Sequence, residues 1–245
     1  WINNMMVRNF SAVLTHRLAE LYSKLLPIPC FLCGEFSQQD ALCKACINDL
    51  PWLDLCCQRC ALPLNENGIC GQCLQQPPPQ QSSLALFRYE TPINHCIAAF
   101  KFHQQLVFTH LFARLLADKI RQQQKPLPEI LIPIPLHTSR IRERGYNQSA
   151  QLADVLTQKL GVKADKTSLI RQRNTTPQAG LSGKQRKRNL KQAFALAKTL
   201  PYKHVALVDD VYTTGHTVAE ACRCLQQNGV ETVEVWTIAR AIRHY

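Results

Sequence analysis

Residues 204–221, which read HVALVDDVYTTGHTVAEA, constrain the fold of this chain more than any other stretch. Val205 to Val208 form an apolar run that is typical of a buried strand in a parallel sheet. A Thr213-Thr214-Gly215 turn follows, and residues 217–228 have helical composition up to the next glycine, a usual stop just past a helix end. Residues 230–238 are rich in Val, Ile, Thr and Trp, which predicts a second strand. The unit is therefore a strand, a loop, a helix and a strand.

The loop after the first of these strands has the chemistry of a site for a phosphate and a sugar. In an open parallel sheet it lies at the carboxyl ends of the strands, where ligands bind. Its backbone N–H groups and the next helix N-terminus favour an anion, which Gly215 lets come close. The carboxylates of Asp209 and Asp210 would repel a phosphate but accept hydrogen bonds from neighbouring hydroxyl groups. The alternative is a buried strand with a polar turn, in which the two acids only cap the loop.

Eight of the twelve cysteines form two copies of one spacing pattern, C-x2-C-x9-C-x2-C. Each C-x2-C pair can present two thiolates to one metal, and two pairs complete a tetrahedral site. Thiolates without carboxylates favour Zn²⁺ in a closed structural site. A disulfide framework is the alternative, but it requires an oxidising compartment, for which we find no targeting segment. The predicted ligands are Cys30, Cys33, Cys43 and Cys46 in the first copy and Cys57, Cys60, Cys70 and Cys73 in the second.

The grouping of these ligands is open in two respects. One zinc site per copy is the simple assignment, and an interleaved arrangement in which the copies share ligands is the alternative. Cys56 lies beside Cys57 and could replace it as a ligand. We expect the remaining Cys96, Cys222 and Cys224 to be small apolar side chains in the core rather than ligands.

The chain is strongly basic, with 29 Lys and Arg against 17 Asp and Glu and a formal net charge of +12. Two sites of four thiolates and one Zn²⁺ would lower the charge of the folded chain to about +8. This balance favours anionic partners. We find no apolar run near the ~20 residues of a membrane span, so we expect a cytoplasmic protein without membrane insertion.

The basic residues gather in two places. Five of them lie within 184–191, which we interpret as a solvated helix face or as contacts to phosphates. Arg140, Arg142 and Arg144 follow the apolar residues 130–135, a predicted strand that closes in a proline-stiffened turn. On a loop at the carboxyl edge of the same sheet, these guanidinium groups would suit a pyrophosphate.

Residues 205–217, VALVDDVYTTGHT, resemble the 5-phosphoribosyl-1-pyrophosphate (PRPP) motif of type I phosphoribosyltransferases. The resemblance implies that Asp209 and Asp210 hold the ribose hydroxyls and that Mg²⁺ binds together with PRPP. It also implies a role for Lys101 at the pyrophosphate, for which a surface lysine is the alternative. The implied PRPP-binding residues are Asp209, Asp210, Val211, Tyr212, Thr213, Thr214, Gly215, His216, Thr217 and Lys101.

Three further motifs narrow the resemblance to the ComF/GntX family. PIPL with RxRGYNQ covers residues 133–148, RxRxTxxQ covers 171–178, and KRNLKxAF covers 187–194. With the paired cysteine ribbons, they imply an α/β type I phosphoribosyltransferase fold, a Rossmann-like parallel sheet flanked by helices, with a small zinc-ribbon module. The family also implies a link to natural competence and single-stranded DNA or, in the GntX branch, to gluconate utilisation.

We expect four segments along the chain. These are an amphipathic helix over residues 1–26, a double zinc ribbon over 27–74, a Pro- and Gln-rich linker over 75–83, and the phosphoribosyltransferase-like domain over 84–245. In the last segment the pattern predicts a strand over 84–89 and helices over 92–100, 106–121 and 147–160. The basic stretch 171–190 is the candidate for a loop that closes over the reacting centre, with a disordered connection as the alternative.

The sequence predicts two alternative functions. The first is an enzyme that binds PRPP with Mg²⁺ and transfers the phosphoribosyl group with release of pyrophosphate, using Asp209, Asp210, Arg142 and Arg144 as catalytic residues. The second is a catalytically silent fold that acts as an adaptor for single-stranded DNA or for proteins of the uptake machinery. Base stacking would support the adaptor, but aromatic residues make up only 7% of the chain.

Overall fold

The computed structural model describes residues 28–37, 40–102, 106–172 and 193–242. The chain divides into two compact units, Trp1–Leu50 and Pro51–Tyr245. The predicted helix over 1–26, the basic cluster 184–191 and nearly all of the candidate closing loop 171–190 lie outside the described residues. The second cysteine copy is part of the larger unit.

The smaller unit contains the first cysteine copy and only short elements. Strands β1 (Ile28–Pro29) and β2 (Phe36–Ser37) pair antiparallel, and Gly34, with φ of 76°, turns the chain between them. Helix α2 (Lys44–Asn48) begins after Cys43, whose sulfur accepts a hydrogen bond from the amide of Cys46 at 3.5 Å. Cys30 thus directly follows β1, Cys43 caps α2, and Cys46 lies within α2.

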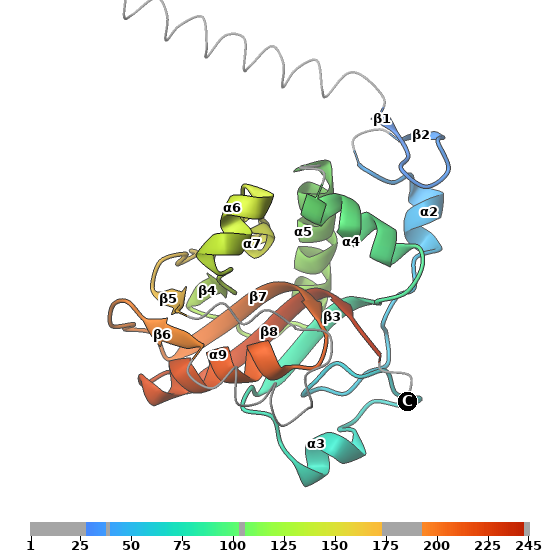
Figure 1. Ribbon diagram of the computed structural model, residues 1–245. Coiled ribbons are helices and arrows are strands. Elements are labelled where there is room, and N and C mark those ends of the chain that lie inside the picture. Colours follow the sequence, from blue (N-terminus) through green and yellow to red (C-terminus); the bar gives the residue numbers. More distant parts are fainter. Residues whose placement is uncertain (1–27, 38–39, 103–105, 173–192, 243–245) are drawn as a thin grey trace, which may run out of the picture. The chain divides into compact units, whose positions relative to one another are not determined.

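The larger unit is built on a parallel sheet of four strands in the order β3-β8-β7-β4 (Figure 1). The central strands β7 and β8 are the longest, and most of their residues are buried, as expected where helices cover both faces. Because the paired strands are parallel, the chain must cross over the sheet between them, and these crossovers carry helices. The strands are β3 (Ser82–Arg88), β4 (Ile130–Pro133), β7 (His204–Tyr212) and β8 (Thr232–Arg240).

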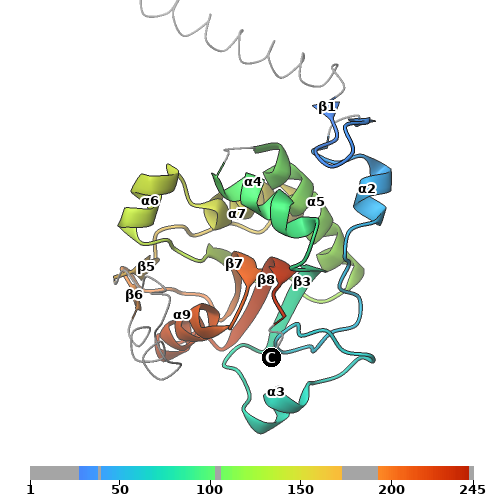
Figure 2. The same ribbon diagram turned by 45° about the vertical axis from the view of Figure 1, so that its right-hand side comes forward.

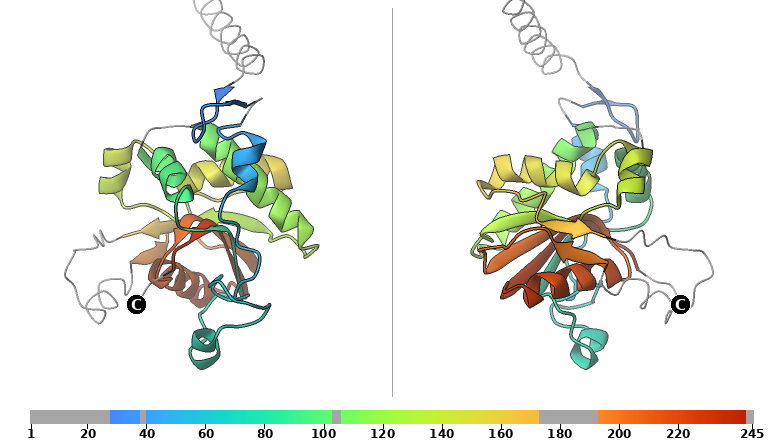
Figure 3. Two further views of the ribbon diagram at one scale, coloured as in Figure 1. Left: turned by 90° about the vertical axis from the view of Figure 1, so that its right-hand side faces the viewer. Right: turned by 60° about the vertical axis from the view of Figure 1, so that its left-hand side comes forward.

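Helices cover both faces of this sheet. Figures 1 and 2 show α5 and α7 over one face and α9 over the other, and Figure 3 shows the same layers from two further sides. A short antiparallel pair, β5 (Leu169–Arg171) with β6 (Phe194–Leu196), lies beside α9. The helices are α3 (Gly71–Gln75), α4 (Ile93–Phe102), α5 (Leu106–Gln122), α6 (Thr138–Arg144), α7 (Gln148–Leu160) and α9 (His216–Gln227).

The expected linker over 75–83 is bonded to the body of the larger unit. Gln80 is 1% exposed. The backbone amide of Gln81 donates to the carbonyl of Val233 at 3.0 Å, and its side-chain oxygen accepts from the amide of Val233 at 2.8 Å. The backbone amide and the side-chain oxygen of Gln81 thus bond to β8 where regular strand pairing has not yet begun, and the segment continues directly into β3.

Two local expectations need correction. Arg140, Arg142 and Arg144 lie in helix α6 rather than on a loop, because His137 caps its start and Gly145, with φ of 81°, ends it. The strand predicted at Val205 to Val208, with the acidic pair at its end, continues past that pair to Tyr212, because Asp209 and Tyr212 still pair with β8. Over the described part of the chain, we find no helix with the length and apolar character needed to cross a membrane.

Candidate functional site

The carboxyl edge of the sheet brings together segments that are far apart in the sequence. Helix α4, which carries Lys101, follows β3, and helices α6 and α7 follow β4. The Thr-Thr-Gly loop follows β7, and Arg240 ends β8. Because all four strands run parallel, these segments gather at the edge where open α/β sheets bind ligands.

Asp209 is half-buried and accepts two hydrogen bonds. Its Oδ1 accepts hydrogen bonds from the hydroxyl of Ser149, at the start of α7, and from the amide of Asp210, both at 2.9 Å. Burial raises the pKa of Asp209, and the charge of Asp210 adds to this effect, while the two hydrogen bonds and Lys101 oppose it. Burial therefore favours the protonated form of Asp209 more than it would in an exposed carboxyl group.

Asp210 forms an ion pair with Lys101. Lys101 Nζ lies 3.0 Å from Asp210 Oδ2, and the two side chains are 20% and 13% exposed. Their low exposure keeps water from screening the pair fully. The structure thus brings Lys101, one of the predicted PRPP-binding residues, to the acidic pair.

The Gly-Tyr-Asn-Gln-Ser stretch 145–149 connects the segments of this edge. Tyr146 donates its hydroxyl to the carbonyl of Phe100 at 2.5 Å, and Gln148 donates to the carbonyl of Lys101 at 3.2 Å. Asn147 caps helix α7. Sequence reasoning used these residues only as a family signature and did not assign Ser149. Their role here is to hold Lys101 and Asp209 in place.

The loop after β7 exposes a helix N-terminus. Gly215 is the N-cap of α9, with φ of 76°, and supplies no side-chain cap, so the first amides of the helix can bind an anion. Thr213 and Thr214 are exposed, and the hydroxyl of Thr214 lies 2.7 Å from Nδ1 of His216. The side chains of Val211 and Tyr212 are buried, so any contact of these two with a ligand would come from the backbone.

Several arginines lie near this edge. Arg142 and Arg144 are in the last turn of α6, and their predicted role at a pyrophosphate stays a prediction. Arg171 is packed over the ring of Phe194 at 5.6 Å. Burial lowers the pKa of Arg171, Arg140 adds to that effect, and Asp209 opposes it. Arg171 is therefore within electrostatic range of Asp209, although the sequence indicated it only as part of a family motif.

The eight predicted metal ligands form two groups in sequential order. Within each group all four sulfur atoms lie within 4.8 Å of one another. Cys33 and Cys43 have sulfurs 3.7 Å apart, and so have Cys60 and Cys70. A tetrahedral site with Zn–S bonds of about 2.3 Å needs sulfurs about 3.8 Å apart, whereas a disulfide needs about 2.05 Å. Both groups therefore fit structural zinc sites, one per copy.

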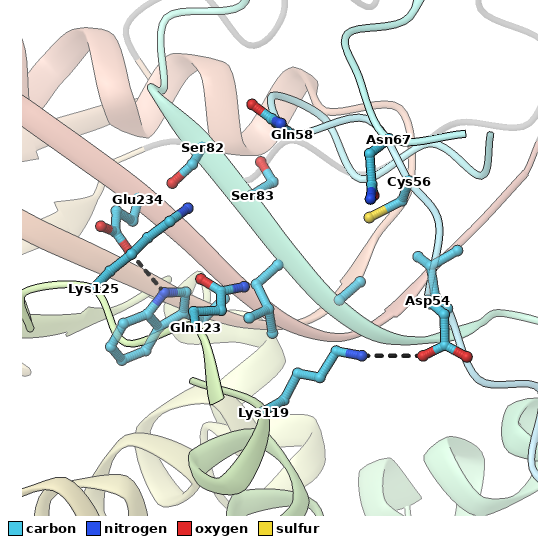
Figure 4. Close-up of a pocket in the computed structure, with 14 residues that line it drawn as sticks. Asp54, Cys56, Gln58, Asn67, Ser82, Ser83, Lys119, Gln123, Lys125 and Glu234 are labelled. Carbon is cyan, nitrogen blue, oxygen red and sulfur yellow. Dashed lines mark hydrogen bonds and ion pairs between the residues drawn. The ribbon is translucent and has the colours of Figure 1, made fainter. Parts of the chain in front are cut away.

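A pocket of about 160 Å³ lies elsewhere on the larger unit (Figure 4). The segment after Leu50 pairs with the edge of β3 at Leu53 and again at Gln58, and leaves β3 uncovered between them. Lys119 and Asp54 form an ion pair of 3.1 Å at this pocket. Because it follows the first half of β3 and β8, it is separate from the acidic pair near the end of β7.

Comparison with known proteins agrees with this geometry. A family model described as a double zinc ribbon domain matches residues 21–74, and one described as a phosphoribosyl transferase domain matches residues 111–244. "Competence protein F" of Haemophilus influenzae is 38% identical over 83% of this chain and 92% of its own length. "DNA utilization protein YhgH" of Salmonella typhi is 36% identical over 82% and 91%. "Competence protein ComFC" of Bacillus subtilis is 26% identical over 86% and 95%.

These matches agree with the two structural parts of the chain. The phosphoribosyl transferase model begins within α5 and ends just after β8, and the zinc ribbon model spans both cysteine groups. The parallel sheet carries the acidic pair and the uncapped helix at its carboxyl edge. The chain therefore belongs to the ComF/GntX family, whose members join a double zinc ribbon to a type I phosphoribosyltransferase domain.

Proposed function

We propose that this chain binds PRPP with Mg²⁺ at the carboxyl edge of the sheet and transfers its phosphoribosyl group to an acceptor. The main support is the position of Asp209 and Asp210 directly before a loop that leads into the uncapped N-terminus of α9. The ribose hydroxyls would donate to the carboxylates. The 5-phosphate would accept from the first amides of α9 and from the hydroxyls of Thr213, Thr214 and Thr217.

In the proposed reaction, the bond between the ribose C1 and the pyrophosphate oxygen breaks, and pyrophosphate leaves with the electron pair. The acceptor forms a new bond to C1 and loses its proton. The negative charge of Asp210, together with that of Asp209 above its raised pKa, would stabilise the oxocarbenium-like transition state. Lys101, Arg142 and Arg144 would balance the charge of the leaving group, and bound Mg²⁺ would add to that balance.

We propose that this reaction takes place in the cytoplasm and serves the use of DNA taken up by the cell. Relatives carry the names competence protein and DNA utilization protein, and the chain has a net charge of +12, which favours nucleic-acid partners. Eight of the twelve cysteines form groups that fit zinc rather than disulfides, which is typical of a reducing compartment. An acceptor derived from nucleic acid would fit both observations.

Calorimetry with PRPP and Mg²⁺ tests the ligand. We expect the wild type to bind, and Asp209→Asn with Asp210→Asn to lose at least about tenfold in affinity, because amides cannot replace two charged acceptors of the ribose hydroxyls. The matched control is Asp118→Asn with Asp154→Asn, two exposed carboxylates in surface ion pairs. A wild type that does not bind, or equal losses in both double variants, contradicts the proposal.

A second candidate function is binding of single-stranded DNA without group transfer. The names of the relatives and the basic charge support it. Affinity for an oligonucleotide, measured at several salt concentrations, should fall steeply with salt if phosphates are contacted. A flat response removes this candidate.

A further inference from the structure

Arg240, at the end of β8, is bonded to both the phosphate loop and the second cysteine group. Its Nε donates to the carbonyl of Cys60 at 2.8 Å. Its Nη1 donates to the carbonyls of Tyr212 at 3.1 Å and Thr213 at 2.5 Å, and also to that of Ala241. The guanidinium stacks on the ring of Tyr212, 4.6 Å from its centre. One side chain therefore connects the turn of a predicted zinc site with the start of the loop.

A second connection runs beside the first. Gln80 Nε2 donates to the hydroxyl of Tyr212 at 2.8 Å and to the carbonyl of Arg59 at 3.1 Å. The hydroxyl of Ser83 donates to the same carbonyl at 2.6 Å. Arg59 lies between the ligands Cys57 and Cys60, so this contact again joins the second cysteine group to the residue before the loop.

Tyr212 transmits this support to Gly215. A Cβ added to Gly215 would lie 2.7 Å from Cε2 and 2.8 Å from the hydroxyl oxygen of Tyr212. The ring is 4% exposed and held by Gln80 and Arg240, so it has little room to shift. The position of Tyr212 therefore sets where the chain enters α9, whose first amides face the proposed phosphate.

We propose that Arg240 is a positioning residue for the 5-phosphate loop, and that the second cysteine group, folded around its metal, holds Arg240 through the carbonyl of Cys60. Arg240 uses its donors on backbone carbonyls, which turns the loop's carbonyls away from the anion and leaves the amides for it. This inference rests on the proposed binding of a 5-phosphoribosyl ligand and adds the origin of the loop's geometry.

The test compares Arg240→Met with Arg88→Met in the full chain. Arg88 pairs with Arg240 in the register of β3 and β8, and its side chain is exposed and bonded to Glu90. Calorimetry is done with ribose 5-phosphate, with PRPP and Mg²⁺, and with pyrophosphate and Mg²⁺. We expect Arg240→Met to lower the affinity for the first two ligands about tenfold or more, and to leave the third unchanged.

Arg240→Lys refines the test. Lysine keeps the charge but lacks the planar fork that reaches several carbonyls at once, so we expect it to recover only part of the loss. If Arg240→Met binds ribose 5-phosphate as the wild type does, or if Arg88→Met loses as much, the inference is wrong. Equal losses for pyrophosphate would also contradict it, because they would show general damage to the domain.

Hydrogen exchange separates this inference from the proposed function. We expect Arg240→Met to speed exchange of the amides of residues 213–219 without any ligand, and Arg88→Met to leave it unchanged. If the wild type binds none of the three ligands, the proposed function is wrong. The exchange result still decides whether Arg240 positions the loop. Unchanged exchange in Arg240→Met overturns the inference in either case.

Discussion

The first and second cysteine groups have the same ligand spacing but different surroundings. The first lies in the unit that ends at Leu50, with Cys33 exposed and Cys43 and Cys46 half-buried. All four cysteines of the second are buried, in one hydrophobic cluster with residues of α9 and of the sheet. The spacing therefore defines a metal site in both cases, and the residues around it decide what the metal stabilises.

Loss of one ligand from each group should have the largest and most unequal effect. We expect Cys60→Ser to lower the free energy of unfolding of the larger unit by about 3 kcal/mol or more, because it removes a buried ligand from a core. Cys33→Ser should change it by less than about 0.5 kcal/mol. Chemical unfolding, followed by the fluorescence of Trp52 and Trp236, measures the difference. Equal effects of the two variants would contradict the claim that only the second cysteine group stabilises the larger unit.

A pair of glycines gives a finer version of the same comparison. Gly34 and Gly215 both have φ of 76°, but an added Cβ meets nothing within 4 Å at Gly34 and meets Tyr212 at Gly215. We expect Gly215→Ala to destabilise the larger unit by about 2–3 kcal/mol, from backbone strain together with the displaced ring. Gly34→Ala should cause only backbone strain, and this strain would destabilise the smaller unit rather than the larger one.

The same unfolding measurement checks both glycine variants. Gly215→Ala should also weaken binding of ribose 5-phosphate, since the start of α9 has to move. An unchanged larger unit in Gly215→Ala would show that the Tyr212 ring is not held as described.

The smallest expected effect concerns the acidic pair. Burial and the charge of Asp210 raise the pKa of Asp209 to about 7, above its value in the unfolded chain. The folded state then holds a proton that the unfolded state has lost, so this group's contribution to stability falls as pH rises from about 4 to about 7. When the pH is raised from 6 to 8, the free energy of unfolding of Asp209→Asn should rise by on the order of 1 kcal/mol relative to that of the wild type.

Asp165 provides a control of opposite sign. Hydrogen bonds from Ser168 and Thr167 lower its pKa, so its contribution is present above about pH 4 and is lost only in acid. Asp165→Asn should therefore show the same difference from the wild type at pH 6 and pH 8. Urea unfolding at both pH values, with zinc present, measures these differences. A constant difference for Asp209→Asn would contradict the raised pKa.

Local patterns predicted the parts of this chain that depend on neighbours in sequence. The apolar run before Asp209, the glycine at the start of α9 and the cysteine spacing each have a short-range physical reason. They led to the parallel sheet, to the loop with its uncapped helix, and to the two groups of four thiols. The helix predicted over 147–160 matches α7, because Asn147 and Gly161 cap its two ends.

The parts that depend on long-range pairing were not predicted. The strand β7 continues through Asp209 and Asp210 because β8 pairs with it, and nothing in the local pattern shows that partner. The bonds of Ser149 to Asp209 and of Arg240 to Cys60 join residues far apart in sequence. The short helix α6 was missed because the prolines before it favoured a loop, although Gly145 was a usable stop signal.

The most direct test of the link between the second cysteine group and the phosphate loop combines zinc content with ligand affinity. Cys33→Ser and Cys60→Ser are each measured for bound zinc per chain and for binding of ribose 5-phosphate by calorimetry. We expect each variant to lose about one zinc, and only Cys60→Ser to lose affinity, by about tenfold or more. Equal affinity in the two variants, with one zinc missing from each, would contradict the account.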